Sequence, residues 1–184
     1  MKKIIFICLV LITSFLNAQN LKFKNFKIAD YEITSDGIVE ISTHSTVDKK
    51  GNIIVYSDSW DGKNFFEYKL SNSEIEKLNS LTERDLEKFV KQKKLNENQF
   101  FAGKRKFITF DYKGKNRSLC FIEPFMNEEF AEILKLLGKN IYGHDENAKI
   151  PMMSTDFEKT KKDIINREKV DNYLPQKAII RQIK

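Results

Sequence analysis

The sequence predicts an α+β fold in which helices pack on one face of an antiparallel sheet. From residue 26 to residue 70 the chain alternates β-favouring runs with short turn signals. After that the apolar period changes from two to about 3.6, which indicates helices. Short links between strands favour antiparallel hairpins, because parallel neighbours need crossovers of about a dozen residues or more. Strands grouped before helices are typical of the α+β class.

The first half of the chain is expected to form a meander of four strands. Asp36-Gly37 and Asp61-Gly62 lie between β-favouring runs and suit hairpin turns, because Asp and Gly tolerate positive φ. The expected strands cover residues 28–33, 38–47, 53–57 and 65–70.

Two short helices, or one broken helix, are expected after the meander. Ser73 and Glu76 have the spacing of a capping box, and Thr82 with Asp85 has the pattern of a second cap. Apolar residues recur at helical spacing behind these caps: Ile75, Leu78 and Leu81, then Leu86, Phe89 and Val90.

A further hairpin and another helix complete the predicted order ββββ-αα-ββ-α. Residues 104–112 and 116–123 flank the turn signal Lys113-Gly114-Lys115. Asn127 then suits the N-cap of a helix whose expected C-terminal stop is Gly138.

The first 18 residues have the three-part layout of a secretory signal peptide. A basic start is followed by an apolar run and then by smaller, more polar residues up to Ala18. The apolar run, even extended to Leu16, spans roughly 20 Å against the ~30 Å hydrocarbon core of a bilayer. We therefore expect cleavage between Ala18 and Gln19 and no transmembrane anchor afterwards.

The end of the leader also bears on localisation. Asn17-Ala18-Gln19 resembles export signals of bacteria with two membranes, which implies a periplasmic or secreted protein. Cys8 lies inside the apolar run without small residues before it, which argues against a lipid anchor. Cys120 is then the only cysteine of the mature chain, so an intramolecular disulfide is impossible.

The mature chain is expected to hold one α+β domain over residues 19–143 and a charged, partly helical extension over residues 144–184. The extension has few apolar residues, so we expect it to be peripheral and a chain ending at Tyr142 to fold cooperatively. Its end, residues 174–181, carries an apolar patch suited to an edge strand or a partner contact.

Catalytic and metal-binding patterns are sparse in this sequence. A thiol nucleophile needs a base nearby, so Cys120 pairs only with His44 or His144, and Asp145 can orient His144. Cys120 nevertheless lies in an apolar strand, where cysteine commonly packs as a small hydrophobe. No metal-ligand spacing, phosphate-binding loop or cofactor motif is present, and we expect no cofactor.

Two further features concern partners. Basic clusters at 91–94 and 104–106 are interleaved with acids, and the formal net charge is only +6, so nucleic acid is not an expected partner. The only tryptophan, Trp60, lies at an expected hairpin tip beside Tyr56 and Phe65, a composition suited to contact with a protein or a glycan. The other interpretation places Trp60 in the core.

The sequence thus favours an exported, non-enzymatic binding protein whose partner is an unidentified protein or glycan. Two alternatives remain open at this point. One is a thiol-dependent hydrolase that uses Cys120 and His144. The other is a carrier of an apolar small ligand, because 15 phenylalanines can line a cavity as well as fill a core.

Overall fold

The computed structural model describes residues 20–60, 62–93, 95–96 and 101–170 of the chain. It confirms the α+β class. A seven-stranded antiparallel sheet has the strand order β6-β5-β1-β2-β3-β4-β7. The strands are β1 (Lys24–Ile33), β2 (Val39–Val47), β3 (Asn52–Ser59), β4 (Gly62–Lys69), β5 (Arg105–Tyr112), β6 (Lys115–Phe121) and β7 (Lys149–Ile150).

The helices follow the predicted order, with short 3₁₀ turns between them. Helix α2 covers Asn72–Asn79, helix α3 covers Glu128–Ile141 and helix α4 covers Glu158–Glu168. The second expected helix is instead a pair of 3₁₀ turns, η1 (Ser80–Thr82) and η2 (Leu86–Phe89). Two more 3₁₀ turns are η3 (Glu123–Phe125) and η4 (Glu146–Ala148).

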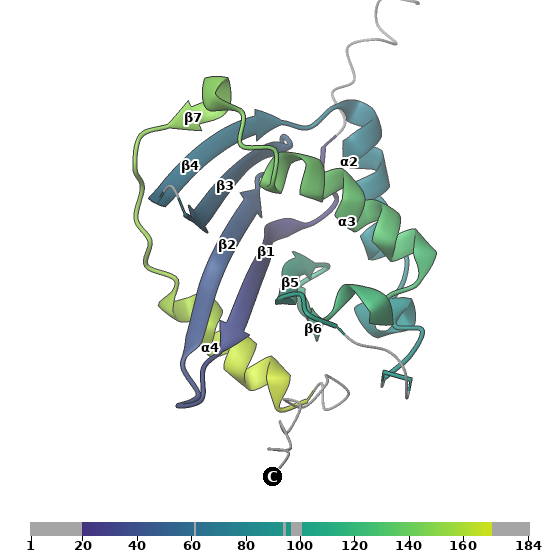
Figure 1. Cartoon of the computed structure of the whole chain (residues 1–184). Coiled ribbons are helices and arrows are strands. Elements are labelled where there is room, and N and C mark those ends of the chain that lie inside the picture. The colour runs from purple at the N-terminus through teal and green to yellow at the C-terminus, as the bar shows by residue number, and fades with distance from the viewer. Residues whose placement is uncertain (1–19, 61, 94, 97–100, 171–184) are drawn as a thin grey trace, which may run out of the picture.

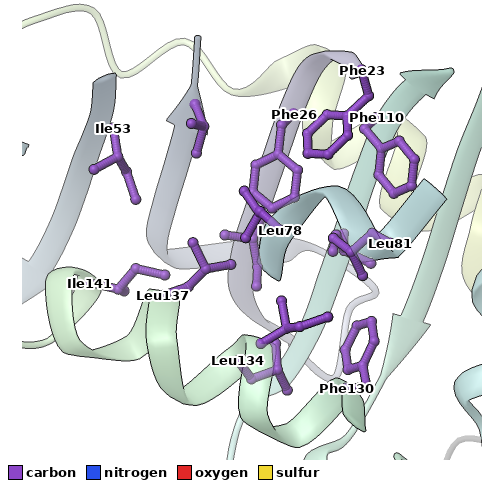
Figure 2. Packing of buried hydrophobic residues seen from close by; sticks show 14 of the residues in the cluster. Phe23, Phe26, Ile53, Leu78, Leu81, Phe110, Phe130, Leu134, Leu137 and Ile141 are labelled. Atoms are coloured by element: carbon purple, nitrogen blue, oxygen red, sulfur yellow. The ribbon is translucent and has the colours of Figure 1, made fainter. Parts of the chain in front are cut away.

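The main core lies between the sheet and the pair α2 and α3. Phe23, Phe26 and Phe110 form a cluster of rings on the sheet, with the Phe23 and Phe110 centroids 4.8 Å apart. Figure 2 shows the apolar stripe of α3 facing this cluster, with Leu134 and Leu137 turned toward the strands. The phenylalanines here pack against each other and so fill the core.

Helix α4 packs on the opposite face of the sheet. Figure 1 shows α3 in front of the sheet and α4 behind β1 and β2. A second apolar cluster lies under α4: Tyr31, Val39, Phe107, Cys120, Ile122, Phe125 and Ile164. Because Ile164 is fully buried there, this part of the extension takes part in a core and is less peripheral than its composition indicated.

Two helix ends differ from the sequence-based expectation. The capping box is formed by Ser71 and Glu74, because β4 ends at Lys69 and the helix begins at once; Ser73 lies inside its first turn. Asn127 does cap α3, and its Oδ1 accepts from the Phe130 N–H at 3.0 Å. The helix continues past Gly138 to Ile141, because buried Ile141 extends the apolar stripe by another turn.

The sheet splits between β2 and β3, and this split positions the candidate site. The pairing of β1 with β2 shifts register between Asp30 and Tyr31, which leaves Ser42 as an extra residue in β2. A β-bulge of this kind bends the strand and increases its twist. The β2–β3 pairing ends next to this bulge, at Thr43 and Ser57. Beyond that point the β1–β2 hairpin and the β3–β4 hairpin diverge.

Within the part of the chain that the structure describes, no helix is long and apolar enough to cross a bilayer. The expected cleavage site at Ala18 and Gln19 and the apolar patch at 174–181 lie outside the described residues. The expectations about export and the terminal patch therefore stay predictions.

Candidate functional site

The β3–β4 hairpin contains the three aromatic residues that the sequence suggested for partner contact. Tyr56 and Phe65 lie opposite each other in the β3–β4 pairing, with ring centroids 5.3 Å apart. Both are buried, and Phe157, which precedes α4, packs on Tyr56 at 4.9 Å. Tyr56 and Phe65 therefore support the hairpin from within and offer little surface to a partner.

Trp60 lies at the tip of the same hairpin and points away from the core. Its side chain is 99% exposed, the highest value among the large hydrophobic residues with an exposed side chain in the described chain. The strand pairing ends with Ser59 opposite Gly62, and Gly62 has a φ of +104°, which suits a tight turn. Trp60 therefore lies beyond the last strand pair of this hairpin.

A cleft of about 540 Å³ lies beside this hairpin, where β2 and β3 diverge. The hairpin contributes Tyr56, Asp58 and Lys63 to its lining, and Asp58 and Lys63 face each other across the ladder next to the Trp60 turn. Ile38, which is 55% exposed, lines the other side. We refer to Trp60 together with the exposed cleft residues Asp58, Lys63 and Ile38 as the hairpin surface.

His44 anchors the start of α4 beside this surface. Its ring stacks on Phe157 at 4.5 Å, and its Nε2 lies 3.2 Å from the Thr160 hydroxyl. Burial, with a smaller contribution from the nearby charge of Lys27, lowers the pKa of His44 to about 4. His44 is thus a neutral, structural residue near pH 7.

The structure does not bring Cys120 and His144 together. Cys120 is buried under α4, with its Sγ 3.9 Å from the Ile164 carbonyl oxygen. His144 lies on the α3 face of the sheet, where its ring stacks on Phe66 at 5.3 Å. The sheet separates the two side chains, so this geometry provides no thiol–imidazole pair.

His144 instead pairs with Ser57, a partner that the sequence analysis did not identify. The Ser57 Oγ and the His144 Nε2 are 3.1 Å apart. A serine and a histidine at this distance are the first two members of a hydrolytic triad. However, Ser57 is buried, neither residue lines the cavities described here, and Asp145 Oδ1 accepts from the Asn147 backbone and side chain. The pair holds the segment after α3 against β3.

A buried ionic cluster at the end of α3 also escaped the sequence analysis. The Lys106 ammonium donates to Asp30 Oδ1 at 2.8 Å and to the Tyr142 hydroxyl oxygen at 2.6 Å. The Tyr142 hydroxyl in turn donates to Asp30 Oδ2 at 2.6 Å. Burial alone would lower the pKa of Lys106, but the charge of Asp30 raises it above its usual value. The lysine therefore stays charged and neutralises a carboxylate inside the fold.

In the described ranges, no group of three or more His, Cys, Asp or Glu side chains is arranged to hold a metal ion. Comparison with known proteins adds no further guide, since no protein-family model, curated protein or solved structure matches this chain. The function must therefore be inferred from the geometry of the chain itself.

Proposed function

We propose that this chain is an exported, non-enzymatic binding protein that contacts a protein or glycan partner through Trp60 and the hairpin surface. The exposure of Trp60 carries the proposal. An indole side chain buries about 150–250 Å² when covered, which at about 25 cal/mol per Å² is worth about 4–6 kcal/mol. Tryptophan is also among the residues most enriched at the energetic centres of interfaces.

The support beneath the hairpin favours this function. Tyr56, Phe65 and Phe157 pack under the strands that carry Trp60, so little backbone freedom needs to be lost on binding. A preorganised contact loses less affinity to ordering than a flexible one. The leader-like first 18 residues support an exported location for the partner.

The experiment is a quantitative capture from the envelope fraction of cells that express the chain. Wild-type protein, Trp60→Ala and Ile165→Ala are immobilised in equal amounts, and captured proteins are identified by mass spectrometry. Ile165 is an exposed apolar residue on α4 and serves as the matched control. A glycan array probed with the same three proteins covers a carbohydrate partner.

We expect one partner to bind wild type and Ile165→Ala and to bind Trp60→Ala at least tenfold more weakly. Tenfold corresponds to about 1.4 kcal/mol, well within what an indole contributes. Trp60→Ala itself should fold normally, with stability within about 0.5 kcal/mol of wild type, because the side chain contacts little in the free protein. Equal affinity of Trp60→Ala and wild type for every partner would contradict the proposal.

A further inference from the structure

A second and larger hollow lies on the α4 face of the sheet, on the other side of this helix. Its volume is about 750 Å³, within the range of about 300–1,000 Å³ that is usual for small-molecule sites. Strands β1, β2, β5 and β6 form its floor, with Lys27, Thr46 and Thr109 among the lining residues. We call it the lysine cavity.

The helical repeat of α4 explains why there are two separate hollows. Thr160 and Ile164, four residues apart, are buried against the sheet. Lys159 and Asp163, one position earlier in each turn, line the lysine cavity. Phe157 and Lys161 line the cleft beside Trp60. Helix α4 thus divides this face of the sheet into two sites of different composition.

The lysines of this cavity lack carboxylate partners. Lys24, Lys27, Lys49 and Lys159 line the hollow, and among the described residues none of them has an Asp or Glu oxygen within 4.0 Å. Exposed lysines without partners are common on protein surfaces. Here, however, they converge on one concavity from one strand, a turn and a helix.

The carboxylates of the cavity are mostly engaged by neutral donors. Asp111 accepts from the Asn116 amide at 2.8 Å and from the Asn25 amide at 2.6 Å. These bonds lower its pKa, and the nearby charges of Lys159 and Lys27 contribute a smaller part of the same shift. Asp48 accepts from the backbone N–H groups of Lys50 and Asn52 within its turn. These neutral donors leave the carboxylates charged, so Asp48, Asp111 and Asp163 together offset three of the four lysine charges and leave one net positive charge around the hollow.

Two irregularities of the β1 backbone lie next to Asp111. Asn25 adopts a left-handed conformation with φ +55°, which is uncommon outside glycine. The β1–β5 pairing shifts register between Lys24 and Lys27 at the same place. The Thr109 hydroxyl accepts from Asn116 at 3.0 Å and keeps its own proton available for donation into the hollow.

We propose that the lysine cavity binds a small organic dianion, either a phosphomonoester or a dicarboxylate. Four ammonium groups that form no ion pair line one hollow with one net positive charge, which favours an anionic ligand whose two charged groups can each meet a lysine, and Thr109 adds a neutral donor. Lysine binds such groups as a point charge, without the planar geometry that arginine imposes. The site is distinct from the hairpin surface and does not depend on the function proposed for it.

The test is calorimetric titration of the whole mature chain with glycerol 3-phosphate and with succinate. Glycerol and the dication putrescine serve as controls for shape and for charge sign, and inorganic phosphate serves as the control for an adventitious ion only. The double variant Lys27→Gln/Lys159→Gln removes two charges from the cavity. Lys135→Gln/Lys139→Gln removes two charges from exposed positions on α3.

We expect at least one organic dianion to bind, and the cavity double variant to weaken that binding at least tenfold while the α3 variant leaves it unchanged. Backbone NMR shifts on titration should be confined to residues 24–27, 46–49, 109–116 and 159–163. Preference for glycerol 3-phosphate assigns a phosphomonoester, and preference for succinate assigns a dicarboxylate.

Three results would overturn the proposal: no binding of either dianion at millimolar concentration, equal binding of inorganic phosphate or putrescine, or equal weakening by the α3 variant. Lys27 is half-buried, so its substitution can disturb folding. If the double variant does not fold, the single variant Lys159→Gln, at an exposed position of α4, is compared with wild type for dianion binding.

Discussion

Lys106 is the residue whose charge the fold depends on most directly. Its ammonium is the cation next to the buried Asp30 carboxylate, and Tyr142 bridges the two. A carboxylate left unpaired inside a protein costs several kcal/mol, far more than an exposed ion pair contributes. The cluster joins β1, β5 and the end of α3, so its loss affects three elements together.

We expect Lys106→Met to lower the free energy of unfolding by about 3–5 kcal/mol, because Asp30 loses the cation that neutralises it and keeps only the neutral Tyr142 hydroxyl of this cluster. Urea denaturation at pH 7 measures the change. Lys139→Met, at an exposed position of α3, is the matched control and should change stability by less than about 0.5 kcal/mol. A loss below about 1 kcal/mol for Lys106→Met would show that the Tyr142 hydroxyl and water are enough to stabilise the Asp30 carboxylate.

His44 gives the fold a pH dependence. Its folded-state pKa of about 4 lies below the ordinary value of 6.5, so the unfolded chain takes up a proton that the folded chain excludes. The corresponding stability is complete above pH 6.5 and is lost as the pH falls toward 4. We expect His44→Gln to remove this component, on the order of 3 kcal/mol, in urea denaturation measured from pH 7 to pH 4. Parallel pH curves for the two proteins would contradict the assignment.

At the scale of elements, α4 is attached by side chains at both of its ends. Phe157 and Thr160 contact His44 near its start. Near its end, Glu168 accepts two hydrogen bonds from Arg105 Nη1 at 2.9 Å and one from the Tyr31 hydroxyl. Between these anchors Ile164 covers Cys120, so the thiol reports whether the helix is docked.

We expect Cys120 to react slowly with a thiol reagent in the native protein and quickly after denaturation. Arg105→Gln should speed the native reaction severalfold by loosening the end of α4, through local opening rather than global unfolding. Lys162→Gln, at an exposed position of α4, should leave the rate unchanged. Rapid labelling of the native wild type would instead indicate an accessible, reactive thiol.

The next prediction concerns whether the domain that was expected to end at residue 143 folds without α4. The sequence-based expectation of cooperative folding for a chain ending at Tyr142 remains untested. Because α4 covers Tyr31, Phe107 and Cys120, we now expect that chain to expose an apolar face and to melt at a lower temperature than the mature protein. Calorimetry of both proteins measures this. Equal melting temperatures would show that α4 adds little stability.

At the scale of the whole molecule, the sheet carries a structural face and a face with hollows. The α3 face is filled by the main core, which reaches back to Leu21 and Phe23 in the N-terminal segment. The α4 face holds the lysine cavity and the cleft beside Trp60 on either side of one helix. The two proposed binding regions can therefore be altered separately.

Cleavage between Ala18 and Gln19 would leave this core complete, since Leu21 and Phe23 stay in the mature chain. We expect N-terminal mass spectrometry of the exported protein to find Gln19 as the first residue. The matched variant Ala18→Leu should block processing, because the peptidase needs a small residue before the cut. An intact Met1 on exported wild type would show that the leader is retained.

Much of the local structure can be predicted from the spacing of neighbouring residues, although the cap of α2 and the end of α3 differ by a few residues. Hairpin turns, the Asn127 cap and the apolar stripes depend on residues within a few positions of each other, so their spacing predicts them directly. Trp60 was placed at a hairpin tip for the same reason. The spacing does not predict whether the Trp60 side chain points outward or into the core. That depends on tertiary packing, because Tyr56 and Phe65 already occupy the space beneath the hairpin.

Which distant residues share a face follows from strand pairing and helix docking, and residue spacing does not predict it. Lys106 meets Asp30, His144 meets Ser57, and Lys159 joins Lys27 only after strands pair and α4 docks. The burial of Ile141 and Ile164 likewise depends on residues from other elements. For that reason α3 continues past the expected stop at Gly138, and the charged extension contributes Ile164 to a core. Side-chain spacing sets each element, but a site formed across a sheet depends on strand order, register and the face on which each helix packs.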